Sequence, residues 1–254
     1  MSDQPKDDSP PPPLPESPHG DPRTSPPLDP YGGFERLEGG DDFPNIINKL
    51  LKKPLSLIYN LEMDDETGRN IPVRLLFISI GCLAVFGLVV GTFSWERQLW
   101  AAPLKIVSGL LFSGLICLPS LYIFACLGGL NARFRTIVGV LCGLIALSAL
   151  LLVGFAPVVW LFSVSSTSVT FLGVLLLTLW IVCASFGLVL VFRAGRALGM
   201  TNTGHLVVWC GVFLLVTLQM TTTLRPIIGS GDKLVNFEEK KFFLAYWGEQ
   251  LTAD

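Results

Sequence analysis

Five long apolar stretches between Ile71 and Ile228 constrain this chain more than any other feature. Each provides at least the roughly 20 residues that an α-helix needs to cross about 30 Å of hydrocarbon. The chain is 51% hydrophobic and 15% charged, whereas a soluble domain carries about a quarter charged residues. The sequence therefore predicts an all-α, polytopic membrane bundle with five transmembrane helices, over residues 71–93, 103–130, 134–158, 169–192 and 205–224.

The N-terminal segment, residues 1–44, differs sharply in composition from the rest of the chain. It contains twelve of the eighteen prolines and has ten acidic residues against three basic ones. So few apolar residues cannot offset the entropy that folding costs, which predicts a disordered acidic tail with polyproline II character. Pro10 to Pro15 and Pro26 to Pro30 resemble generic proline-rich ligands, so the tail is either a docking segment or a solvated spacer.

Residues 45–70 form an amphipathic juxtamembrane segment followed by an acidic connector. Ile46, Ile47, Leu50 and Leu51 repeat near helical spacing, with lysines off that stripe, and Pro54 interrupts the pattern. A basic amphipathic segment before a first span is typical of a helix in the membrane interface, and a helix packed on the protein itself is the alternative.

The connections between the expected spans are short, at residues 94–102, 131–133, 160–168 and 193–204. Basic residues gather in the second and fourth of these and before the first span. By the positive-inside rule this places the N-terminus in the cytoplasm. The expected location is thus an integral membrane position, in a bacterial inner membrane or a eukaryotic endomembrane.

Two GxxxG patterns indicate where helices approach closely. They are Gly87 with Gly91 and Gly139 with Gly143. Since lipid tails are as apolar as leucine, membrane helices associate through close packing and interhelical hydrogen bonds, which small residues permit. Packing within one bundle and homo-oligomerisation both fit these motifs.

The sequence offers little for chemistry inside the membrane. The expected spans carry ionisable residues only near their ends, whereas ion-driven carriers normally need a mid-membrane carboxylate. The most polar intramembrane cluster ends the fifth span. Its members are Gln219, Thr221, Thr222, Thr223 and Arg225. They are candidates for interhelical bonds or for holding an anionic group, with helix capping as the alternative.

Motifs of catalysis and of metal or cofactor binding are missing from the sequence: there is no HExxH, GxSxG, P-loop or Cys-x-x-Cys pattern. We therefore predict no catalytic residues, no bound metal, no cofactor and no nucleic-acid partner. Membrane lipids are the expected partners, and proteins could dock on the tail or on the C-terminal segment, residues 229–254. That segment is aromatic and helix-like, which suits an interfacial or partner-binding helix.

The layout resembles the Yip1-like family of small five-span membrane proteins. The resemblance covers residues 43–224, mainly as topology, with local echoes at Lys53-Pro-Leu-Ser-Leu and at residues 192–199, Phe-Arg-Ala-Gly-Arg-Ala-Leu-Gly. The Asp-Leu-Tyr-Gly-Pro-like motif of eukaryotic members is not present. The resemblance implies a role in membrane organisation or trafficking through binding, without catalysis.

The sequence thus predicts a non-catalytic integral membrane protein of the scaffold or membrane-organising type. A subunit of a membrane transport complex, whose charged pathway comes from a partner, is the alternative.

Overall fold

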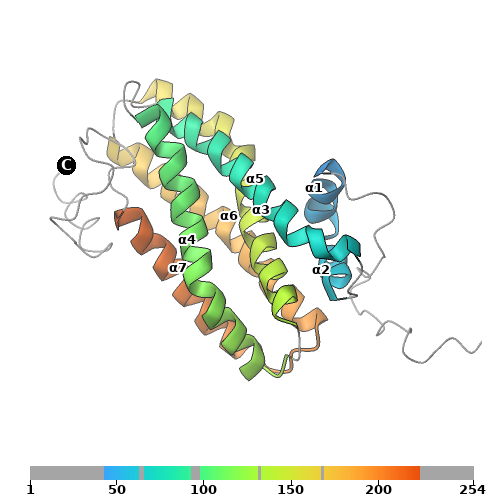
Figure 1. Ribbon diagram of the computed structural model, residues 1–254. Coiled ribbons are helices and arrows are strands. Elements are labelled where there is room, and N and C mark those ends of the chain that lie inside the picture. The colour runs from blue at the N-terminus through green and yellow to red at the C-terminus, as the bar shows by residue number, and fades with distance from the viewer. Residues whose placement is uncertain (1–42, 63–65, 93–97, 131–132, 167–168, 224–254) are drawn as a thin grey trace, which may run out of the picture. The chain divides into compact units, whose positions relative to one another are not determined.

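The computed structural model describes residues 43–62, 66–92, 98–130, 133–166 and 169–223, all of which belong to one compact unit. The described part is helical (Figure 1). Its elements are α1 (Phe43–Lys52), α2 (Pro54–Glu62), α3 (Glu66–Gly91), α4 (Gln98–Leu127), α5 (Phe134–Ser165), α6 (Val169–Ala197) and α7 (Gly204–Thr223). The predicted tail up to residue 42 and the predicted C-terminal segment, residues 229–254, lie outside the described residues.

Four of the helices are long and apolar enough to cross a membrane. These stretches are Asn70–Gly91, Ala102–Leu127, Phe134–Ser165 and Phe171–Ala197. The described apolar stretch of α7, Gly204–Met220, is shorter. For the described residues, the prediction of a helical membrane bundle is confirmed, with four helices of spanning length where the sequence predicts five.

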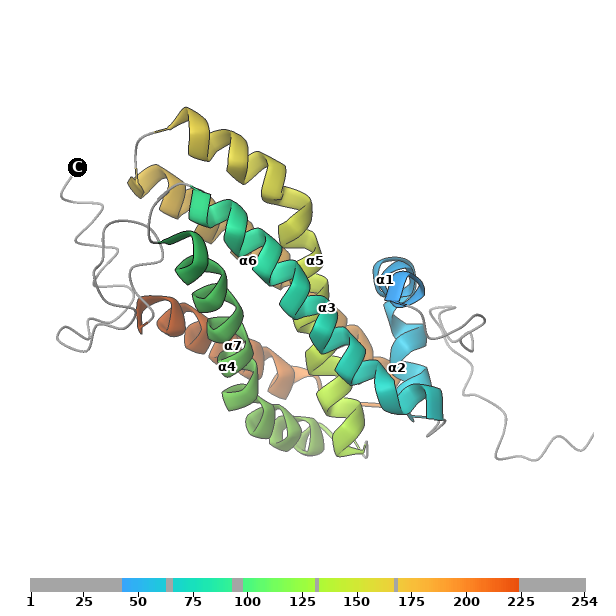
Figure 2. The ribbon, with the colours of Figure 1, turned by 45° about the horizontal axis from the view of Figure 1, so that its top comes forward.

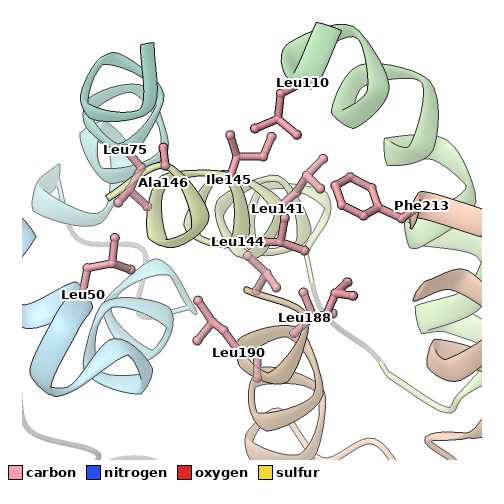
Figure 3. Close-up of a cluster of buried hydrophobic side chains, with 14 of the residues drawn as sticks. Leu50, Leu75, Leu110, Leu141, Leu144, Ile145, Ala146, Leu188, Leu190 and Phe213 are labelled. Carbon is pink, nitrogen blue, oxygen red and sulfur yellow. The ribbon is translucent and has the colours of Figure 1, made fainter. Parts of the chain in front are cut away.

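Helix α5 occupies the centre of the bundle. It packs against α3 and α6, and also against α4 and α2, while α7 packs against α4. In the most apolar window of α5, 61% of the residues are buried, against 33–39% in the other three long helices. Figure 3 shows side chains from α1, α3, α4, α6 and α7 directed toward Leu141, Leu144 and Ile145 of α5. A helix that is apolar on all sides and surrounded by others forms the core of such a bundle.

Two predicted connections are wrong in extent. Residues 160–165 continue α5, and residues 193–197 continue α6. Pro157 lies inside α5 without ending it. A proline is tolerated inside membrane helices because neighbouring groups can satisfy the backbone that it disturbs. The true connections are therefore even shorter than expected.

The amphipathic segment divides into two helices at Pro54. The Lys53 N–H donates to the Lys49 carbonyl oxygen at 2.7 Å and closes α1, and the Ser56 hydroxyl donates to the Lys53 carbonyl oxygen at 2.8 Å. Proline suits the first position of α2, where its missing N–H has no intrahelical partner to lose. Both helices lie against one end of the bundle (Figures 1 and 2).

Helices α1 and α2 are packed on the protein through one apolar face. Ile46, Leu50, Leu57 and Leu61 are each at most 2% exposed. Figure 3 shows Leu50 directed toward the core. The sequence left open whether this segment lies in the membrane interface or packs on the protein. This apolar face packs on the protein.

Candidate functional site

Helices α4 and α6 end in the same kind of turn. In α4, the Gly129 N–H donates to the Cys126 carbonyl oxygen at 3.0 Å and the Leu130 N–H to that of Ala125 at 3.1 Å. This is a Schellman motif, in which a residue of positive φ closes the helix and an apolar residue follows it. Gly129 has a φ of 85°, which glycine adopts without steric cost.

The end of α6 repeats this arrangement. The Gly199 N–H donates to the Arg196 carbonyl oxygen at 3.1 Å, and the Met200 N–H donates to that of Gly195 at 2.9 Å. Gly199 has a φ of 89°. We call residues 125–130 and 195–202 together the paired turns.

The paired turns are bonded to each other through one atom. The carbonyl oxygen of Gly128 accepts hydrogen bonds from the N–H groups of Thr201 and Asn202, at 3.2 and 3.3 Å, and from the Thr201 hydroxyl at 3.3 Å. A side chain at position 128 would not fit, since its Cβ would lie 2.6 Å from the Met200 methyl carbon and 2.9 Å from the Asn202 carbonyl oxygen. The contact therefore holds the α4–α5 connection against the α6–α7 connection.

A small apolar cavity of about 20 Å³ lies beside the paired turns. Its walls come from α4, α5, α6 and α7 and include Leu130, Ile137, Met200 and Leu206. Such a volume has room for about one water molecule, and a lining without polar partners keeps a cavity dry. This cavity is too small and too apolar to bind a solute.

Cations gather at the end of the bundle that carries the paired turns. Arg133 is exposed just before α5, and Arg193 and Arg196 are exposed in the last turns of α6. Figure 1 shows the end of α4, the start of α5, the end of α6 and the start of α7 at this end. Among the side chains that the structure describes, none is acidic. The exposed cations of the described helices are therefore concentrated at one end.

Lys105 differs from these cations. It lies in the second turn of α4, at the other end of the bundle, and is only 6% exposed. Sequence reasoning assigned it to a helix end where its side chain could reach water. The structure buries it instead.

Three of the four predicted packing glycines lie at contacts between helices, and the fourth is buried. A Cβ on Gly87 would overlap the backbone of Pro103 in α4, and Gly91 is buried. A Cβ on Gly139 would lie 2.6 Å from a methyl carbon of Leu61 in α2, and one on Gly143 would lie 3.5 Å from a methyl carbon of Leu190 in α6. The GxxxG motif of α5 therefore contacts α2 at Gly139 and α6 at Gly143, one turn further along.

Gly187, which the sequence pairs with Ala184 as a patch of small residues, lies at a close contact between α6 and α5. A Cβ on Gly187 would lie 2.5 Å from the Ser148 hydroxyl oxygen and 2.9 Å from the Leu144 carbonyl oxygen. The same Ser148 hydroxyl donates to the Cys183 carbonyl oxygen at 3.3 Å. Small residues such as Ala184 and Gly187 on one helix permit this approach.

The predicted polar cluster is only partly described. Gln219 is half-buried near the end of α7. Thr221, Thr222 and Thr223 belong to α7, but their side chains, and Arg225 altogether, lie outside the described residues. The structure does not bring this cluster to the paired turns, which lie at the opposite end of α7.

Within the described part of the chain, no group of three or more His, Cys, Asp or Glu side chains could hold a metal ion. The six cysteines form no disulfide. Comparison with protein families, with curated proteins and with solved structures finds no match to this chain.

Proposed function

We propose that this protein is a non-catalytic integral membrane protein of the scaffold or membrane-organising type. The observation that supports it best is the packed core around α5, to which six other helices contribute apolar side chains. Figure 3 shows part of this core. Helices that pack this closely form a rigid support for groups at their ends, and the short connections leave little room for a separate reactive domain.

The proposal includes a topology and a means of action. Helix α7 is the fifth span, because its 20 residues suffice to cross the hydrocarbon region. The N-terminus lies in the cytoplasm, since the exposed cations of the described helices gather at the end of the bundle where α1 begins, and cytoplasmic ends are rich in Lys and Arg. The Pro-rich tail of residues 1–44 and the segment 229–254 are its docking arms for protein partners. The topological resemblance to the Yip1-like family agrees with this assignment.

Affinity purification from native membranes in mild detergent tests the proposal. Full-length protein is compared with a variant that lacks residues 1–44, and partners are identified by mass spectrometry. We expect a set of partners that is lost with the tail. If the two forms retain the same partners, or if neither retains any, the tail is not a docking arm.

The second candidate function is a subunit of a membrane transport complex, and Lys105 is the observation that favours it. An ionisable residue buried within a span often marks a pathway for ions or protons. Methionine replaces the lysine stem at similar length without its charge. In reconstituted liposomes, ion flux that Lys105→Met abolishes would establish the transport function, whereas an absence of flux with both proteins would support the scaffold.

A further inference from the structure

Helix α1 has two apolar sides, and the bundle covers only one of them completely, although Ile47 on the other side also packs partly against the core. Ile46 and Leu50 are buried, at 1% and 2% exposure. Phe43 and Leu51 remain 50% and 52% exposed, and Ile47 between them is half-buried. Since residues four apart share a helix face, Phe43, Ile47 and Leu51 form one stripe beside the buried face. We call these three residues the outer stripe.

The contact between α2 and α5 fixes the position of α2 along the axis of α5. Leu61 of α2 packs on Gly139 of α5. Gly139 lies one turn beyond Arg135, and therefore about 6 Å further along the helix axis. Interfacial helices insert about 5–10 Å into the boundary between headgroups and acyl chains. A place for the α1–α2 pair at the membrane surface agrees with this distance, and it directs the outer stripe toward acyl chains.

Exposed cations lie at this same level. Leu190 of α6 packs near Gly143, one turn further into α5 than the Leu61 contact. Since α6 runs antiparallel to α5, the residues that follow Leu190 lead back toward the level of α2. These residues include Arg193 and Arg196, which are both exposed. Lys52 and Lys53 are exposed where α1 meets α2.

We propose that this end of the bundle binds the headgroups of anionic lipids in the surrounding leaflet. The outer stripe inserts between acyl chains, and Lys52, Lys53, Arg193 and Arg196 contact the lipid phosphates. Guanidinium groups bind phosphate through paired hydrogen bonds, and lysines contribute point charges. The proposal goes beyond the proposed function, since it holds equally for a scaffold and for a transport subunit.

Native mass spectrometry of the full-length protein from nanodiscs tests this. The nanodiscs contain phosphatidylcholine and phosphatidylglycerol in equal amounts, and the ratio of the two lipids retained is measured. We expect phosphatidylglycerol to be enriched. Two double variants remove cations, Lys52→Gln/Lys53→Gln and Arg193→Gln/Arg196→Gln. Each should lower the enrichment, by about fivefold at most for every cation removed, because one basic residue near an anionic surface contributes about that much. Phe43→Ser/Leu51→Ser should lower retention of both lipids.

A further variant keeps the test specific. Arg193→Lys/Arg196→Lys keeps the charge and should retain most of it, which distinguishes charge from misfolding. Equal retention of the two lipids by the unaltered protein, or equal enrichment in all variants, would overturn the proposal.

Discussion

The indole N–H of Trp209 donates a hydrogen bond of 3.1 Å to the backbone carbonyl oxygen of Cys117, and this bond joins α7 to α4. Both residues are almost completely buried. Trp209 also stacks on Phe213, with ring centroids 5.3 Å apart. In hydrocarbon no water competes for such a bond, although measured interhelical bonds contribute only about 0.6–2 kcal/mol.

Replacing Trp209 with phenylalanine should weaken the attachment of α7. The substituted side chain keeps an aromatic ring beside Phe213 but has no donor, and it leaves a small void. We expect Trp209→Phe to lower the stability by about 1–3 kcal/mol, measured by thermal unfolding in detergent. Trp180→Phe, at a half-buried position on α6, is the control and should cost less. An equal loss in both variants would contradict a special role for the bond.

Adding a methyl group at Gly187 should separate α5 from α6. The new Cβ would lie 2.9 Å from the backbone carbonyl oxygen of Leu144, which cannot move aside as a flexible side chain could. We expect Gly187→Ala to destabilise the protein by about 1–3 kcal/mol, the usual cost of overpacking.

Gly211 on α7 is the matched control for this variant, because an added Cβ there meets no atom within 4 Å. Alanine is the better helix former by about 1 kcal/mol, so Gly211→Ala should be neutral or stabilising. Should Gly187→Ala prove as stable as Gly211→Ala in the same unfolding assay, the close contact between α5 and α6 would be refuted.

Gly199 tests the turn that ends α6. Its φ is 89°, and an added Cβ meets no atom within 4 Å, so a substitution there changes backbone strain alone. We expect Gly199→Ala to cost about 1–2 kcal/mol, the penalty of the left-handed conformation for a residue with a Cβ. Gly199→Asn should cost less, because asparagine tolerates this conformation. Circular dichroism during heating measures both, and a larger loss for Asn than for Ala would contradict the explanation.

The long helices could be predicted from the sequence because runs of apolar residues are a local property. Asn70–Gly91 and Phe171–Ala197 show this. The helix ends were less predictable. The charged residue Arg193 predicts the start of a connection, but α6 continues to Ala197. The turn that ends the helix contains Gly199, which has a positive φ. The glycine followed by an apolar residue, in both Gly129-Leu130 and Gly199-Met200, was the signal for these ends.

Contacts between distant residues could not be predicted in the same way. The bonds from Thr201 to Gly128 join positions 73 residues apart, and no local pattern indicates such a pairing. The apolar face of α1 could equally have faced lipid, since its periodicity does not distinguish lipid from protein as the surrounding. The structure shows that Ile46 and Leu50 face protein.

The last prediction concerns Leu61 and Gly139, the contact that holds α2 on α5. Leu61→Ala removes most of a buried side chain and should cost about 2–5 kcal/mol. Gly139→Ala brings a new methyl group within 2.6 Å of Leu61 and should cost about 1–3 kcal/mol. In the double variant the methyl group introduced at position 139 occupies space that the leucine side chain has vacated, so the two losses should not add. A double-mutant cycle from thermal unfolding should give a coupling energy of about 0.5–3 kcal/mol. Additive losses would show that Leu61 and Gly139 are not in contact, and that the position of α2 has another cause.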